Sequence, residues 1–93
     1  MEVELIIYEI KPSKDVLKNI KKLEKSQKSK IREFITLLKL NPIPNCHDIK
    51  KMSSRHPPQF RVRFGKFRLI YMIDNNKKII YLLKLERREQ VYK

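Results

Sequence analysis

The sequence predicts one α+β domain of order β-α-α-β-β-β, in which a two-helix hairpin covers one face of a mainly antiparallel sheet. Residues 59–64, 67–73 and 78–85 are apolar strand patterns joined by short turns. Ahead of them, apolar side chains recur at helical spacing as far as Asn41. Ninety-three residues suffice for one domain with a modest core, so we expect residues 1–93 to form a single domain.

The N-terminal segment is predicted to form a strand over residues 2–9, because its apolar residues alternate with glutamates. A helix should begin after Pro12, with Ser13 as its N-cap. Asp15 then lies in the first turn, where a negative charge suits the helix dipole. One face of this helix is apolar and carries Val16, Leu17, Ile20 and Leu23.

A second helix is expected after a break at residues 26–29. Its apolar stripe consists of Ile31, Phe34, Ile35 and Leu38. Asn41-Pro42 should end it, because proline cannot continue a helix. A proline-rich connector over residues 41–59 follows, and its piece 48–52 is either a short strand or a turn at the sheet edge.

The first hairpin turns at Gly65-Lys66, and a two-residue turn with glycine first is typical of type II′. This turn places Arg63 directly opposite Arg68. Like charges in this arrangement are unfavourable unless an anion lies between them. The alternative is that both side chains extend into water, where surface charges are screened at small cost.

The second hairpin is predicted to turn over residues 74–77, which are rich in turn-forming residues. This turn pairs Ile73 with Lys78 and places Arg68 opposite Leu83. One sheet face is then cationic and carries Arg61, Arg63, Arg68, Tyr81 and Arg87. The other is the core face and carries Phe60, Val62, Phe64, Phe67, Leu69, Tyr71, Ile80 and Leu82. No histidine or acidic residue is expected beside the paired arginines.

The net charge of +13, from 23 Lys and Arg against 10 Asp and Glu, indicates a polyanionic partner such as nucleic acid, the ribosome, an anionic membrane or an acidic protein. A lysine-rich solvated surface is the alternative. No apolar run approaches the roughly 18–20 residues that span a bilayer, and no signal peptide is evident, so we expect a cytoplasmic protein. Cys46, His47 and His56 lie in the connector, and we expect no disulfide, metal or cofactor.

Two segments near the C-terminus carry a resemblance to a known family. The first runs from Arg61 to Tyr71, RVRFGKFRLIY, and the second from Arg87 to Tyr92, RREQVY. They resemble the R-x-R-x-G-x-[YF]-R-[ILV]-[ILV]-Y hairpin and the closing V-Y of the RelE/ParE toxin superfamily. Residues 48–92 carry the specific match, whereas the first strand and the helices match in order and length.

The resemblance implies a toxin of a type II toxin–antitoxin system. In the RelE branch it implies an mRNA interferase, a metal-independent endoribonuclease that enters the ribosomal A site and inhibits translation by cleaving messenger RNA. A ribose 2′-oxygen attacks the adjacent phosphate. The implied catalytic residues are Arg61, Arg63, Arg68, Arg87 and Tyr92. The implied partners are an acidic RelB-like antitoxin, the ribosome and its mRNA.

In this resemblance Arg63, Arg68 and Arg87 are expected to hold the scissile phosphate and to stabilise its transition state. Tyr92 is expected to stack on a base or to exchange a proton with the 2′-hydroxyl. Replacing Arg87 with alanine is expected to abolish toxicity. The fold should stay intact, because Arg87 is expected to be exposed.

This chain departs from the RelE branch at the positions that could supply a general base. Arg61 and Arg63 stand where the RelE branch commonly has lysines, and arginine, with a pKa above about 12, is a poor base. Lys66 and Lys84 are candidates by proximity only. Two other functions stay open: a ParE-like inhibitor of DNA gyrase, and a non-catalytic RNA- or ribosome-binding module or degenerate toxin. The complete set of site residues favours the ribonuclease.

Overall fold

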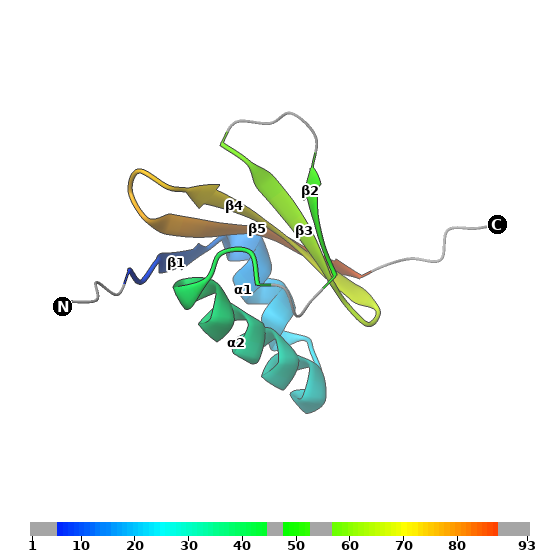
Figure 1. The fold of residues 1–93 in the computed structure, drawn as a ribbon. Coiled ribbons are helices and arrows are strands. Elements are labelled where there is room, and N and C mark those ends of the chain that lie inside the picture. The colour runs from blue at the N-terminus through cyan, green and yellow to red at the C-terminus, as the bar shows by residue number, and fades with distance from the viewer. Residues whose placement is uncertain (1–5, 45–47, 53–56, 88–93) are drawn as a thin grey trace.

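The computed structural model describes residues 6–44, 48–52 and 57–87, which form two helices and a five-stranded sheet. In chain order the elements are β1 (Glu9–Pro12), α1 (Lys14–Lys21), α2 (Lys25–Leu40), β2 (Ile49–Met52), β3 (Gln59–Phe64), β4 (Phe67–Asp74) and β5 (Ile79–Arg87). The sheet order is β1-β5-β4-β3-β2, and both helices lie against one face (Figure 1). The predicted α+β class is therefore confirmed, with β2 added at the sheet edge.

The sheet is mixed, because β1 pairs with β5 in parallel and the other pairs are antiparallel. The first strand begins later than predicted, at Glu9, and residues 1–5 lie outside the described residues. Just ahead of it, the backbone N–H of Tyr8 donates to the Lys39 carbonyl at 2.9 Å. This bond ties the segment to the end of α2 and leaves only the residues from Glu9 onward to pair with β5.

Ser13 is the N-cap of α1, as predicted. Its Oγ accepts a hydrogen bond from the Val16 backbone N–H at 3.1 Å and donates one to the Leu83 carbonyl at 3.0 Å. The hydroxyl thus satisfies an orphan donor of the helix and fastens α1 to β5. The predicted break at residues 26–29 is wrong, because α2 begins at Lys25 and includes them.

We expect Ser13→Ala to lower the free energy of unfolding by about 1–2 kcal/mol, because both hydrogen bonds of the hydroxyl are lost. Urea denaturation measures this change. Ser29→Ala is the matched control, since Ser29 is exposed within α2 and alanine favours helices. Equal midpoints for wild type and Ser13→Ala would contradict the capping role.

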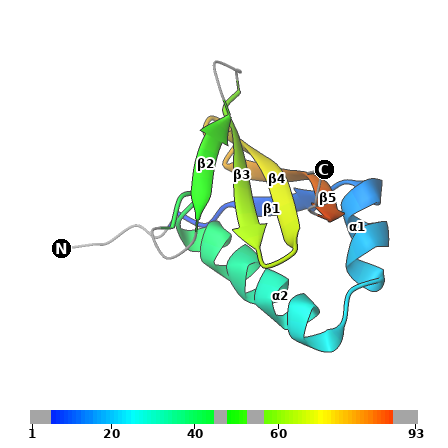
Figure 2. The same cartoon turned by 90° about the vertical axis from the view of Figure 1, so that its right-hand side faces the viewer.

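The two helices cover the same face of the sheet and form a V in Figure 2, with the connection between Lys21 and Lys25 at its vertex. α1 lies along β5, and α2 crosses beneath β3. Within the described ranges, neither helix is long and apolar enough to cross a membrane.

The core lies between the helices and the sheet and is built around Phe34 of α2, which is fully buried. Its ring meets Phe64 and Tyr71 edge-on, with centroids 5.1 and 6.0 Å apart. Tyr71 is also buried and donates its hydroxyl to the Pro42 carbonyl at 2.9 Å. Every residue of the predicted core face belongs to this core or packs against it. Leu17, which was predicted to lie on the apolar face of the first helix, is 49% exposed.

The first hairpin has the predicted register, with Phe64 opposite Phe67. Gly65 has a φ of 55°, as the first central position of a type II′ turn requires. The second hairpin differs from the prediction, because Asp74 is still in β4 and pairs with Ile79. The Asp74 carboxylate accepts hydrogen bonds from the backbone N–H groups of Asn76 and Lys77, each at 3.0 Å. Lys78 ends the loop in the left-handed conformation, with a φ of 57°.

Candidate functional site

A cluster of cationic side chains lies on the sheet face that the helices leave uncovered. Arg63 is directly opposite Arg68, as predicted. Lys50 of β2 pairs with Arg61 of β3, and Lys84 of β5 pairs with Ile70 of β4. We call this set the basic face: Lys50, Arg61, Arg63, Arg68 and Lys84. Val62, which lies between Arg61 and Arg63 in β3, is fully buried. Because side chains alternate along a strand, these two arginines point away from the core.

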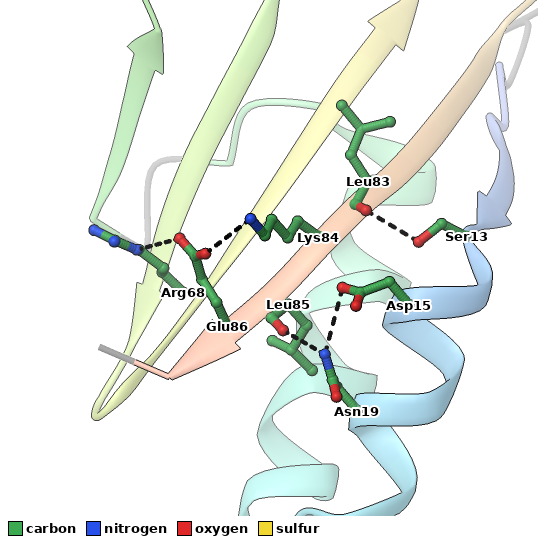
Figure 3. A network of polar contacts seen from close by, with 8 residues as sticks. All are labelled: Ser13, Asp15, Asn19, Arg68, Leu83, Lys84, Leu85 and Glu86. Carbon is green, nitrogen blue, oxygen red and sulfur yellow. Dashed lines mark hydrogen bonds and ion pairs between the residues drawn. The ribbon is translucent and has the colours of Figure 1, made fainter. Parts of the chain in front are cut away.

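Two carboxylates accompany the basic face, against the prediction that none lies there. Glu86 Oε2 is 2.8 Å from Arg68 Nε, and Glu86 Oε1 is 3.5 Å from Lys84 Nζ. Asp48 Oδ2 is 3.9 Å from Arg63 Nη1. Each arginine of the cross-strand pair thus has an acidic neighbour, which offsets part of the like-charge repulsion. Figure 3 shows Glu86 between Arg68 and Lys84.

A β-bulge in β5 explains why Glu86 was missed. Tyr71 pairs with Leu82, but Ile70 pairs with Lys84, so Leu83 is the extra residue. Beyond the bulge every β5 side chain changes face. Together with the two-residue difference in register at the second loop, the bulge places Arg68 opposite Glu86 instead of the predicted Leu83. In the structure the spacing of buried residues changes from two to three along Ile80, Leu82 and Leu85. The sequence hides this change, because Leu83 is also apolar and continues the alternation to Leu85.

Helix α1 holds the bulged strand from the other side. Ser13 donates to the Leu83 carbonyl at 3.0 Å, and the Asn19 side-chain amide donates to the Leu85 carbonyl at 2.9 Å. Figure 3 shows these bonds on the opposite side of β5 from Arg68. The carbonyls of the irregular strand are therefore paired with side chains of α1, which fixes the register that follows.

The same bulge separates Arg87 from the other predicted arginines. Arg87 is opposite Phe67, so its side chain starts on the helix-covered side, and the prediction that it shares a face with Arg68 is wrong. It is exposed, as predicted, and helps to line a cavity of about 330 Å³ together with Asn19 and Leu23. Arg68 and Arg87 thus flank the end of β5 from opposite sides.

The chain matches the family described as the ParE toxin of type II toxin–antitoxin systems over residues 5–92. This chain belongs to the ParE toxin family. The RelE1 protein of Methanocaldococcus jannaschii is 40% identical to it over 87 residues, which cover 92% of this chain and 96% of that protein. The ParE-family chain is thus a RelE-like toxin of a type II toxin–antitoxin system.

Solved structures agree with this membership. The RelE–RelB complex of Pyrococcus horikoshii contains a chain that superimposes on this ParE-family toxin with a TM-score of 0.84, at 30% identity, covering 91% of this chain and 99% of that one. The isolated Escherichia coli RelE toxin gives a TM-score of 0.74 at 14% identity, covering 89% and 86%, and so shares the fold.

The predicted site residues of the ParE-family toxin have different outcomes. Arg61, Arg63 and Arg68 come together on the basic face, and Arg87 lies around the strand end. Tyr92 lies outside the described residues. Of the proposed bases, Lys66 is in the first hairpin turn and Lys84 is on the basic face. Lys50 was missed, because residues 48–52 were predicted only as a short strand or a turn at the sheet edge, and the pairing of Lys50 with Arg61 depends on the register of β2.

Proposed function

We propose that this RelE-like toxin is a ribosome-dependent endoribonuclease that cleaves messenger RNA in the A site. The observation that carries the proposal is the directly opposed pair Arg63 and Arg68 on an open sheet face, with Arg61 and Lys50 beside it. Side chains of one sign crowded on an exposed surface form an anion-binding site, and RNA supplies closely spaced phosphates. The site would act in the cytoplasm, where ribosomes are.

The proposed reaction needs no cofactor. The ribose 2′-oxygen forms a bond to the adjacent phosphorus while the bond from phosphorus to the 5′-oxygen breaks. The 2′-hydroxyl loses its proton, and the leaving 5′-oxygen gains one. Because negative charge accumulates on the phosphoryl oxygens in the transition state, guanidinium groups that are already in place lower the barrier most.

The proposed catalytic residues are Arg61, Arg63, Arg68, Arg87 and Tyr92. Arg63 and Arg68 hold the scissile phosphate, since their paired guanidiniums match its oxygens bidentately. Arg61 binds the neighbouring phosphate of the same strand. Arg87 reaches the RNA around the end of β5, and Tyr92 stacks on a base or exchanges the 2′-proton.

A guanidinium is a donor without an acceptor atom, so the arginines are assigned no part in removing the 2′-proton. Lys84 is linked to Arg68 of the phosphate-binding pair, because both contact the Glu86 carboxylate. Lys66 is at the tip of the first hairpin. With only these groups available, positioning of the RNA by the ribosome supplies much of the rate, so free RNA should be a poor substrate.

The proposed regulator is an acidic antitoxin of the RelB type. The solved neighbours from Pyrococcus horikoshii and Mycobacterium tuberculosis are a RelE–RelB complex and the RelBE2 toxin–antitoxin complex. The basic face would attract acidic segments of such a partner by the same charge that attracts RNA. Binding of the antitoxin across Arg61 and Arg63 would then exclude the message.

A cellular experiment separates this function from gyrase inhibition, the second candidate, which the ParE name of the family favours. We expect induction of the toxin without an antitoxin to stop translation, and primer extension to show messages cut within codons. Coexpression of a neighbouring open reading frame, where it encodes a small acidic protein, should restore growth. A DNA-damage response with filamentation and intact messages would instead identify a gyrase inhibitor, and lack of toxicity would oppose both.

A further inference from the structure

We infer that Glu86 is a positioning residue of the basic face, which orients Arg68 and Lys84 for a phosphate of the RNA. The inference rests on the proposed ribonuclease function and adds to it a residue of opposite charge. A carboxylate on an RNA-binding surface weakens the attraction for phosphates. Its presence between two cations therefore calls for a compensating role.

The contacts indicate which role this is. Glu86 Oε2 accepts a hydrogen bond from Arg68 Nε at 2.8 Å, and Oε1 lies 3.5 Å from Lys84 Nζ. One carboxylate thus engages a cation on each of two neighbouring strands, β4 and β5. The Glu86 side chain is 28% exposed, less than that of Lys84 at 59%, so its own position is restricted by neighbours.

The geometry of the guanidinium makes the contact useful. Arginine carries five N–H donors in one rigid plane, and this hydrogen bond uses the donor on Nε. The bond therefore fixes the plane of the guanidinium while the donors of the two terminal nitrogens extend beyond it. A side chain held in this way loses less rotational freedom when it binds a phosphate, because the ordering has already occurred in folding.

The position of Glu86 depends on the bulge. Leu83 is the extra residue, and Ser13 and Asn19 bind the carbonyls of Leu83 and Leu85 from α1 (Figure 3). Without the extra residue, the side chain of residue 86 would point to the helix-covered side. The fold thus places one carboxylate of the basic face between Arg68 and Lys84, and the other, Asp48, lies beside Arg63.

The test compares wild type with Glu86→Gln in cleavage of a defined message on programmed ribosomes. We expect kcat to fall about tenfold, because a charge-assisted hydrogen bond becomes a neutral one. We expect KM to stay equal or to decrease, because the surface loses a negative charge. Glu86→Asp should restore part of kcat. Glu33→Gln, which removes an exposed charge from α2, is the matched control and should leave both constants unchanged.

A double-mutant cycle with Arg68→Ala tests whether Glu86 acts through this arginine. In the Arg68→Ala background, Glu86→Gln should lower kcat much less than tenfold, since the group it positions is gone. An unchanged kcat in Glu86→Gln, or an equal tenfold loss in the Arg68→Ala background, would overturn the inference. So would a rise in KM with constant kcat, which would show a binding contact instead.

A second readout does not depend on activity. In a nitrogen-15 spectrum, the Nε–H signal of Arg68 should be protected from exchange in wild type and less protected in Glu86→Gln, where the hydrogen bond is neutral and weaker. A protected signal in a toxin that does not cleave on ribosomes would mean that the proposed function is wrong. Cleavage by wild type without such a signal would mean that the positioning role of Glu86 is wrong.

Discussion

Arg68→Ala is expected to lower the rate of ribosome-dependent mRNA cleavage by about 10²–10³-fold, as removal of one preorganised donor to a developing oxyanion typically does. Arg68 combines the features that predict a large effect. It lies opposite Arg63, its side chain is 35% exposed, and its Nε is bonded to Glu86 at 2.8 Å. An ordered guanidinium at the centre of the basic face is well placed to stabilise a phosphoryl transition state.

The measurement is single-turnover cleavage on programmed ribosomes, which isolates the chemical step. Arg32→Ala is the matched control, because Arg32 is exposed on α2 and loses the same charge. Stability should change by no more than about 1 kcal/mol in either variant, because Arg32 is exposed and the ion pair of Arg68 is still partly open to solvent, which screens it. Equal cleavage rates for Arg68→Ala and Arg32→Ala would show that cleavage depends on the total positive charge of the protein surface and not on Arg68, which would contradict its proposed role.

Phe34→Ala is expected to remove about 3–5 kcal/mol of stability, the usual cost of deleting a buried phenyl ring. Phe34 is fully buried and meets Phe64 and Tyr71 edge-on. Small domains are stable by about 5–15 kcal/mol, so the variant should be partly or largely unfolded at physiological temperature. Since Phe34 joins α2 to the strands that carry the arginines, toxicity should be lost as well.

Urea denaturation of purified protein measures the effect, with Leu37→Ala as the control on the same helix. Leu37 is 38% exposed, so its truncation leaves no full cavity and should cost about 1 kcal/mol or less. A similar midpoint for the Phe34 and Leu37 variants would contradict the placement of Phe34 at the centre of the core.

Local sequence rules predicted much of the fold. Gly65 fixes the first hairpin, because its positive φ selects a two-residue turn, and that turn alone sets Arg63 opposite Arg68. Ser13 marks the start of α1 through its capping hydroxyl. The core sides of β3 and β4 follow from alternation, which needs only the period of the strand and not its neighbours.

The parts that were predicted wrongly depend on contacts between distant segments. The start of β1 is set by the bond from the Tyr8 backbone N–H to the Lys39 carbonyl. The extra residue Leu83 is held by a serine of α1. None of these contacts follows from local propensity, and a single bulge reverses every face assignment after it.

The bulge also changes the candidate site. With continued alternation, Arg87 would have joined the other arginines and Glu86 would have faced the helices. In the structure the two exchange places: Glu86 pairs with Arg68, and Arg87 lies on the side of Phe67. The site proposed for RNA therefore combines a sheet face with the end of β5, and its charge pattern includes a carboxylate.

The most direct test of the central claim is to add the purified toxin to ribosomes that hold a defined codon in the A site, and to the same message free in solution. The proposed function predicts cleavage within the A-site codon, little cleavage of the free message, and the loss of ribosomal cleavage in Arg68→Ala. Absence of cleavage on ribosomes by a folded wild-type toxin, or cleavage that Arg68→Ala leaves unchanged, would contradict it.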